Sequence, residues 1–224
     1  MDRAGLYRLM AWLSPAFPTG AFSYSHGIEY AVEAGLVADR ASLVAWVGHI
    51  LRSGTGRVDA MLFRAAYDAA DDSARLDEIA ELAAAFRSTS ETALESAQQG
   101  AAFLAATRHA WPNEYLDAFH ARHGDGAVAL PVAVALACAA RVELDLALSA
   151  YLQAMAANLV SAGVRLIPLG QSDGQSALAA LEPVVDRATS EALSNRLEEI
   201  GSAAPMVDWT SMRHETQYTR LFRS

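Results

Sequence analysis

Apolar residues recur at intervals of three and four along most of this chain, which is the periodicity of an amphipathic α-helix. Strand signals are nearly absent, since the sequence has no alternating Val, Ile and Thr run and no Asn-Gly hairpin. The pattern therefore predicts an all-α protein. We expect helices over 5–13, 21–35, 40–53, 57–71, 74–87, 89–109, 113–122, 127–140, 143–163, 174–182 and 183–200.

Several of these helices carry recognisable end signals. A Ser or Thr among residues 88–90 can cap the long helix that follows, and Asp39 can cap the helix that begins at residue 40. Trp111-Pro112 should end the long helix, because the residue before a proline resists the helical conformation. Pro183 fits the first turn of a helix better than a helix interior, so we expect a new helix to start there.

The last twenty residues differ from the rest. Residues 205–224 combine small residues and a proline with a polar, basic end that contains aromatic rings. We expect residues 1–204 to form one compact, bundle-like domain of about ten helices, and residues 205–224 to form a flexible tail that need not pack on its own domain.

The composition indicates that the protein binds another protein. Hydrophobic residues make up 53% of the chain and charged residues only 19%. Such a surplus indicates apolar surface that is buried against another protein. No apolar run approaches the roughly 18 residues of a membrane span. The start of the chain does not resemble a signal peptide, so we expect a cytoplasmic protein.

Charge and cysteine content exclude other classes. Lys and Arg number 17 against 26 Asp and Glu, which leaves a net charge of −9 and makes nucleic-acid binding a poor candidate. The single cysteine, Cys138, lies among alanines and leucines and is expected to be a buried apolar residue.

Known catalytic and metal-binding patterns are missing. There is no P-loop, so the chain is not itself a P-loop GTPase or ATPase. The segment HETQY (214–218) begins like a zinc-protease motif, but Tyr218 stands where the second histidine must be. His120 and His123 could share a helix face and bind a divalent metal weakly, although a solvated pair is the simpler interpretation.

The segment SPAFPTGAFSYSHGIE (14–29) is the most varied in the chain. On a helix, His26 and Glu29 would share a face with Phe22, and they could fix that helix through hydrogen bonds to a neighbouring segment. One alternative is an all-α small-molecule hydrolase with a pocket of Tyr24, His26 and Glu29. Another is a purely structural, homodimeric helical protein.

Three separated segments together resemble one family, the urease accessory protein UreF. They are SPAFPTGAFSYSHGIEYAVEAGLV (14–37), VRLIPLGQSDGQSALAALEPVV (164–185) and SMRHETQYTRLFRS (211–224). Their order and spacing fit the family over nearly the whole chain, and the C-terminal segment is the most specific of the three.

The resemblance implies a non-enzymatic, all-α protein that forms a homodimer. Proteins of this family assemble with the accessory scaffold UreD or UreH and with the GTPase UreG, dock on apo-urease and support nickel delivery to it. The chain would bridge scaffold and GTPase and regulate GTP hydrolysis. The resemblance implies no tightly bound cofactor, because nickel would be handled transiently by the complex, and no nucleic acid or membrane partner.

Two groups of residues are candidates for partner contacts in that setting, and the tail over residues 205–224 is expected to order when the scaffold binds. The candidates for the GTPase side are Tyr24, His26, Glu29, Arg213, His214, Glu215 and Arg220. The candidates for the scaffold side are Tyr218, Leu221, Phe222 and Arg223.

Overall fold

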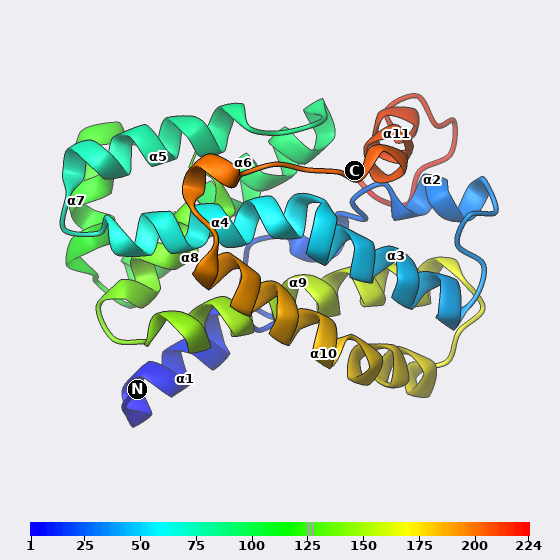
Figure 1. Ribbon diagram of the computed structural model, residues 1–224, viewed down its shortest axis with the longest axis horizontal. Helices are drawn as coiled ribbons and strands as arrows, with labels where there is room; N and C mark the ends of the chain where they lie inside the picture. The colour runs from blue at the N-terminus through cyan, green and yellow to red at the C-terminus, as the bar shows by residue number, and fades with distance from the viewer. Residues whose placement is uncertain (125, 127) are drawn as a thin grey trace.

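A computed structural model describes residues 1–124, 126 and 128–224, and within this part of the chain the secondary structure is entirely helical (Figure 1). The all-α prediction is confirmed. In chain order the helices are α1 (Arg3–Trp12), η1 (Ala21–Ser23), α2 (Ile28–Glu33), α3 (Arg40–Ser53), α4 (Thr55–Asp68), α5 (Ser73–Ala85), α6 (Ser90–Ala110), α7 (Glu114–His123), α8 (Leu130–Ala139), α9 (Leu144–Leu166), α10 (Gln171–Ser194), η2 (Leu197–Glu199) and α11 (Pro205–His214).

Helix α8 lies at the centre of the bundle. Its residues 131–138 are all buried, because it is apolar around its whole circumference and packs between α4 and α6. Helices α9 and α10 pack against each other, and α3 lies against α10. At one end of this core, far from α1, the short helix α2 lies beside α11 (Figure 1).

Most helix ends follow the sequence signals. Asp39 accepts a hydrogen bond from the backbone N–H of Ser42 and caps α3. Thr89 caps α6 in the same way, and α6 ends at Ala110, with Trp111 as its C-terminal cap. The start predicted for α8, residue 127, lies outside the described residues; the helix itself begins at Leu130. Cys138 is buried as expected, and burial raises the pKa of its thiol to about 12.

Three of the predicted helices are wrong. Residues 21–35 do not form one helix, because a turn at residues 24–27 separates η1 from α2. Residues 174–182 and 183–200 are not two helices, because α10 runs through Pro183. Pro183 and Ala179, whose carbonyl loses its helical donor, both lie on the exposed side of α10. Water can therefore replace the missing hydrogen bond, and the helix continues.

The tail packs on its own domain, contrary to the expectation. Residues 205–214 form α11, which contacts α2 and α6, and Val207 and Phe222 are buried. This structure describes the tail in its packed state. The ordering of the tail on partner binding concerns a change between two states and stays a prediction.

Among the described residues, α9 is the helix whose length and mean hydropathy of 1.2 match those of a membrane span. Half of that stretch is buried inside the protein, and the helix packs against α10, α3 and α4. This is the environment of a core helix in a helical bundle.

A substitution at Gly100, where α6 crosses α8, would test the fold. A Cβ atom added at Gly100 would lie 1.9 Å from the carbonyl oxygen of Val128. We expect Gly100→Ala to destabilise the protein by about 1–3 kcal/mol in denaturant unfolding, because backbone atoms must move to admit the methyl group. Gly201→Ala is the control, since a Cβ there meets nothing within 4 Å. Equal stabilities of the two variants would contradict this packing.

Candidate functional site

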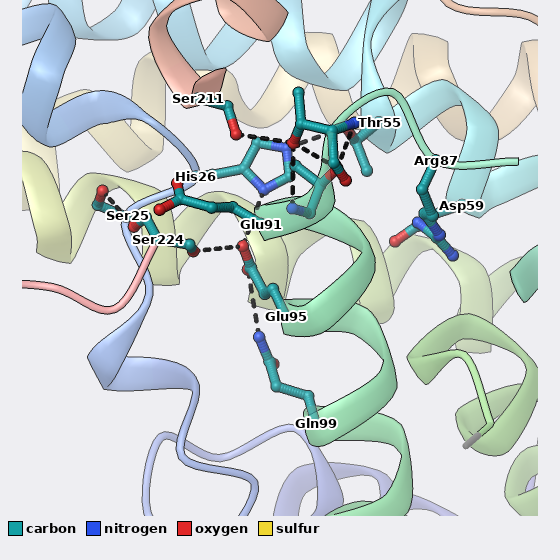
Figure 2. A network of polar contacts seen from close by, with 12 residues as sticks. Ser25, His26, Thr55, Asp59, Arg87, Glu91, Glu95, Gln99, Ser211 and Ser224 are labelled. Atoms are coloured by element: carbon teal, nitrogen blue, oxygen red, sulfur yellow. Dashed lines mark hydrogen bonds and ion pairs between the residues drawn. The ribbon is translucent and has the colours of Figure 1, made fainter. Parts of the chain in front are cut away.

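A turn before α2 directs His26 into the protein. His26 and Gly27 both have positive φ, at 56° and 76°, and the N–H of Ile28 closes the turn on the carbonyl oxygen of Ser25 at 3.0 Å. Positive φ is unusual for a residue with a side chain. His26 is only 3% exposed and lies between α6 and the start of α4 (Figure 2). Its Nδ1 is 3.2 Å from Glu95 Oε2, and its Nε2 is 2.9 Å from Thr55 Oγ1.

The same turn allows α11 to approach closely. A Cβ atom at Gly27 would lie 2.7 Å from the backbone nitrogen of Ser211 on α11. The hydroxyl group of Ser211 is in turn 2.8 Å from that of Thr89, which caps α6. Helices α2, α6 and α11 therefore meet at one point.

His214, at the end of α11, joins these three helices. Its Nδ1 lies 2.9 Å from Glu91 Oε1 on α6, and its Nε2 lies 3.1 Å from Glu29 Oε2 on α2. The side chain is fully buried, and both carboxylates are nearly so. A buried carboxylate needs a partner, and one imidazole serves two of them here.

Glu29 also holds the end of the tail. Its two carboxylate oxygens accept hydrogen bonds from the backbone N–H groups of Leu221 at 2.6 Å and Phe222 at 2.9 Å. The carbonyl oxygen of Ser224 accepts from both the N–H and the hydroxyl of Ser25, each at 2.6 Å (Figure 2). The hydroxyl of Ser224 donates to Glu95 at 3.0 Å.

Helices α2, α6 and α11 and the end of the tail meet in one junction. The buried charges of this junction shift the pKa values of its side chains. Burial alone would lower the pKa of His26, but the charge and hydrogen bond of Glu95 outweigh it and leave that pKa raised. This stabilising contribution is complete below the ordinary histidine value and is lost as pH rises through the raised one. Burial also raises the pKa of Glu91, against the opposing hydrogen bond and charge of His214.

Comparison with known proteins shows the family of this chain. The family model described as UreF matches residues 37–182, which is more than half of the chain. The chain belongs to the UreF family of urease accessory proteins. A "Urease accessory protein UreF" from Granulibacter bethesdensis is 56% identical over 99% of this chain and 94% of its own length. Proteins with the same name from Rhodopseudomonas palustris HaA2 (53% identical, 99% and 94% covered) and Bradyrhizobium sp. BTAi1 (52%, 100% and 94%) are also similar.

Family membership places the chain among accessory chaperones rather than enzymes, so the hydrolase alternative is set aside. The local geometry agrees. The hydroxyl of Ser25 is engaged with Ser224. A cavity of about 380 Å³ shares Thr55 with the junction, but Tyr24, His26 and Glu29 do not line it.

The structure brings most of the predicted partner-binding residues of this UreF-family chain into one region, but it divides them by burial. Five of them are buried: Tyr24, His26, Glu29, His214 and Phe222. The hydroxyl of Tyr24 donates a hydrogen bond to Gln98. On a helix, His26 was expected to share a face with Phe22; the turn separates them, and Phe22 is 67% exposed. The predicted partner contacts stay predictions, and the inward-facing residues position the surface above them.

The remaining candidates are exposed. Arg213 donates a hydrogen bond to the hydroxyl of Tyr30, and Glu215 accepts one from Ser90. Arg220 approaches Glu91 at 3.7 Å and is 43% exposed. Tyr218, Leu221 and Arg223 are exposed.

Sequence reasoning missed half of this junction. The missed residues are Thr55, Glu91, Glu95, Ser211 and Ser224. One signal was available: Glu91 and Glu95 are four residues apart after the Thr89 cap, so they lie on one face of α6. Among the described residues, no group of three or more His, Cys, Asp and Glu side chains is arranged to hold a metal ion. His123 instead pairs with Asp77 at 2.7 Å.

The close approach at Gly27 can be tested against a matched glycine. In Gly27→Ala the new methyl group would be strained by the left-handed backbone and would clash with Ser211. We therefore expect the free energy of unfolding, measured with denaturant, to fall by about 2–4 kcal/mol. Gly35 has nearly the same φ, 73°, but open space around it. Gly35→Ala should lose only about 1–2 kcal/mol. Equal losses would contradict the contact between α2 and α11.

Proposed function

We propose that this UreF-family chain bridges the accessory scaffold UreD or UreH and the GTPase UreG, and regulates GTP-dependent nickel insertion into apo-urease. In this proposal the chain acts as a homodimer in the cytoplasm, and nickel is cargo of the complex rather than a resident ion. The family assignment supports a role in urease maturation, and the absence of a P-loop from the sequence fits a partner of a GTPase.

The observation that carries the proposal is the exposed face of α11 and the tail. Thirteen large apolar side chains are exposed among the described residues, and five of these lie within residues 205–224. Concentrated exposed apolar side chains are typical of interaction sites. They are Met206, Trp209, Met212, Tyr218 and Leu221.

Tyr218 and Leu221 are the strongest candidates for contact with the scaffold. Tyr218 is fully exposed and Leu221 is 65% exposed, while their neighbour Phe222 is buried with the guanidinium of Arg165 4.3 Å from its ring centre. Phe222 and Glu29 would hold the tail, and Tyr218 and Leu221 would present apolar area beside Arg220 and Arg223. Aromatic and arginine side chains are enriched at such binding sites.

The GTPase side of the proposal uses Arg213, Glu215 and Arg220. These three residues are exposed and lie close to the Glu29, Glu91 and His214 bridge. The guanidinium carbon of Arg213 lies 5.5 Å from the ring centre of Tyr30. The ring of Tyr30 also contacts the ring of Trp209. His26, Glu29 and His214 would act in this proposal by fixing the positions of these side chains.

Scaffold capture tests the proposal. We expect the double variant Tyr218→Ala/Leu221→Ala to bind UreD or UreH at least about tenfold more weakly, because central apolar contacts each contribute above about 1 kcal/mol. Affinity would be measured with the purified full-length chain and the scaffold. Leu146→Ala is the control, since Leu146 is an exposed leucine on α9, outside the tail. Wild-type affinity in the double variant would contradict the proposed contact.

A further inference from the structure

Helix α1 carries an apolar stripe on its outer side. Leu9 and Trp12 are buried and attach the helix to the core. Leu6, Tyr7 and Met10 lie on another face and are 45%, 70% and 68% exposed. Residues three or four positions apart are neighbours on a helix, so Leu6 and Tyr7 both lie next to Met10. Exposed apolar side chains that gather in this way are typical of an interaction site.

The inner side of α1 holds the helix in a fixed position. A Cβ atom at Gly5 would lie 2.9 Å from the carbonyl oxygen of Arg141, which comes just before α9. The ring of Trp12 meets those of Phe103 and Trp111 edge-on. The stripe is therefore presented by a helix that is already ordered, so binding there costs little conformational entropy.

Two charged side chains without ionic partners accompany the stripe. Arg3 lies one turn before Tyr7 on the same face of α1. It is exposed, and its guanidinium makes no hydrogen bond or ion pair within the part of the chain that the structure describes. Asp145, on the first turn of α9, is also exposed. Its carboxylate accepts the N–H of Leu146 at 2.8 Å and pairs with no cation among the described residues.

These features make the surface complementary to itself. In a twofold pair every contact occurs twice, so Arg3 of each copy can meet Asp145 of the other. Such reciprocal ion pairs would offset the repulsion between two chains that each carry a net charge of −9. An anionic membrane fits the surface less well, because it would repel the same net charge and offer Asp145 no cation.

The position of the surface also fits a second copy. Helix α1 lies at the end of the molecule remote from α11 and the C-terminus (Figure 1). A pair formed through α1 therefore leaves the tails of both copies accessible. The proposed scaffold contact at Tyr218 and Leu221 is compatible with such a pair.

We propose that the outer face of α1 and the first turn of α9 form the surface through which two copies of this chain pair. The inference rests on the homodimer in the proposed function and adds the surface that forms it. Tyr7 and Met10 supply the apolar centre, and Arg3 and Asp145 pair reciprocally at its rim. Leu146, which is 41% exposed on the same turn of α9 as Asp145, enlarges the apolar area.

Sedimentation velocity of the purified full-length chain tests this surface. We expect Tyr7→Ala/Met10→Ala to raise the dissociation constant of the dimer at least about tenfold, because each truncated contact is lost twice. Both side chains are largely exposed and alanine is favourable in a helix, so the fold should be retained. Tyr218→Ala/Leu221→Ala changes the other end of the molecule and is the control, which should keep the wild-type dissociation constant.

The results distinguish the surface from the dimer itself. A dimer whose dissociation constant is unchanged by Tyr7→Ala/Met10→Ala would overturn the surface and leave the homodimer standing. A wild-type chain that stays monomeric would overturn both, while scaffold capture would still test the bridging role. Wild-type monomers that bind phosphatidylserine vesicles, and lose this binding in Tyr7→Ala/Met10→Ala, would overturn the proposal in favour of a membrane contact.

Charge reversal tests the ion pair. Arg3→Asp and Asp145→Arg should each raise the dissociation constant about threefold or more, because like charges would then meet across the interface. The combined variant should recover affinity, which a folding defect would not allow. Arg187→Asp is the matched control, since Arg187 is an exposed arginine on α10 that also lacks an ionic partner within the described residues. A combined variant as weak as the single ones would overturn the pairing of Arg3 with Asp145.

Discussion

One buried imidazole between two carboxylates organises the functional end of this protein. Glu29 and Glu91 come from different helices and are both removed from water, which is costly for a charge without a partner. One ring nitrogen of His214 faces each of these carboxylates, and these contacts fix α11 against α2 and α6. Because Gly27 has no side chain, the backbone of Ser211 can approach closely enough for these contacts to form.

The shape of the neighbouring surface depends on the contacts of His214 with Glu29 and Glu91. Glu29 uses the same carboxylate to orient the backbone of Leu221 and Phe222, so the tail is held by polar contacts rather than by a large apolar core. Phe222 turns inward, while Tyr218 and Leu221 turn outward. A buried charged residue thus positions exposed apolar residues. Such an arrangement suits an accessory protein, which must keep its exposed binding surface in a fixed conformation.

The sequence was sufficient to predict the helices but not the junction. Periodicity and caps such as Asp39 are local signals, and they identified most helix ends correctly. The turn at His26 failed as a prediction because its left-handed conformation depends on contacts with α6 and α4, which are distant in the chain. His214 was predicted as a contact for the GTPase and examined as part of an incomplete zinc motif, but not as a partner of Glu29, since nothing local connects it with that residue 185 positions away. The resemblance to UreF joined the two segments before the structure showed their contact.

A double-mutant cycle on Glu29 and His214 tests the bridge most directly. The free energy of unfolding would be measured for the wild type, Glu29→Ala, His214→Ala and the double variant. Each single change removes the same buried contact between the two side chains, so the two effects should be strongly non-additive, with a coupling of about 1.5 kcal/mol or more. Additivity within about 0.5 kcal/mol would show that the two side chains do not depend on each other, and would contradict the account.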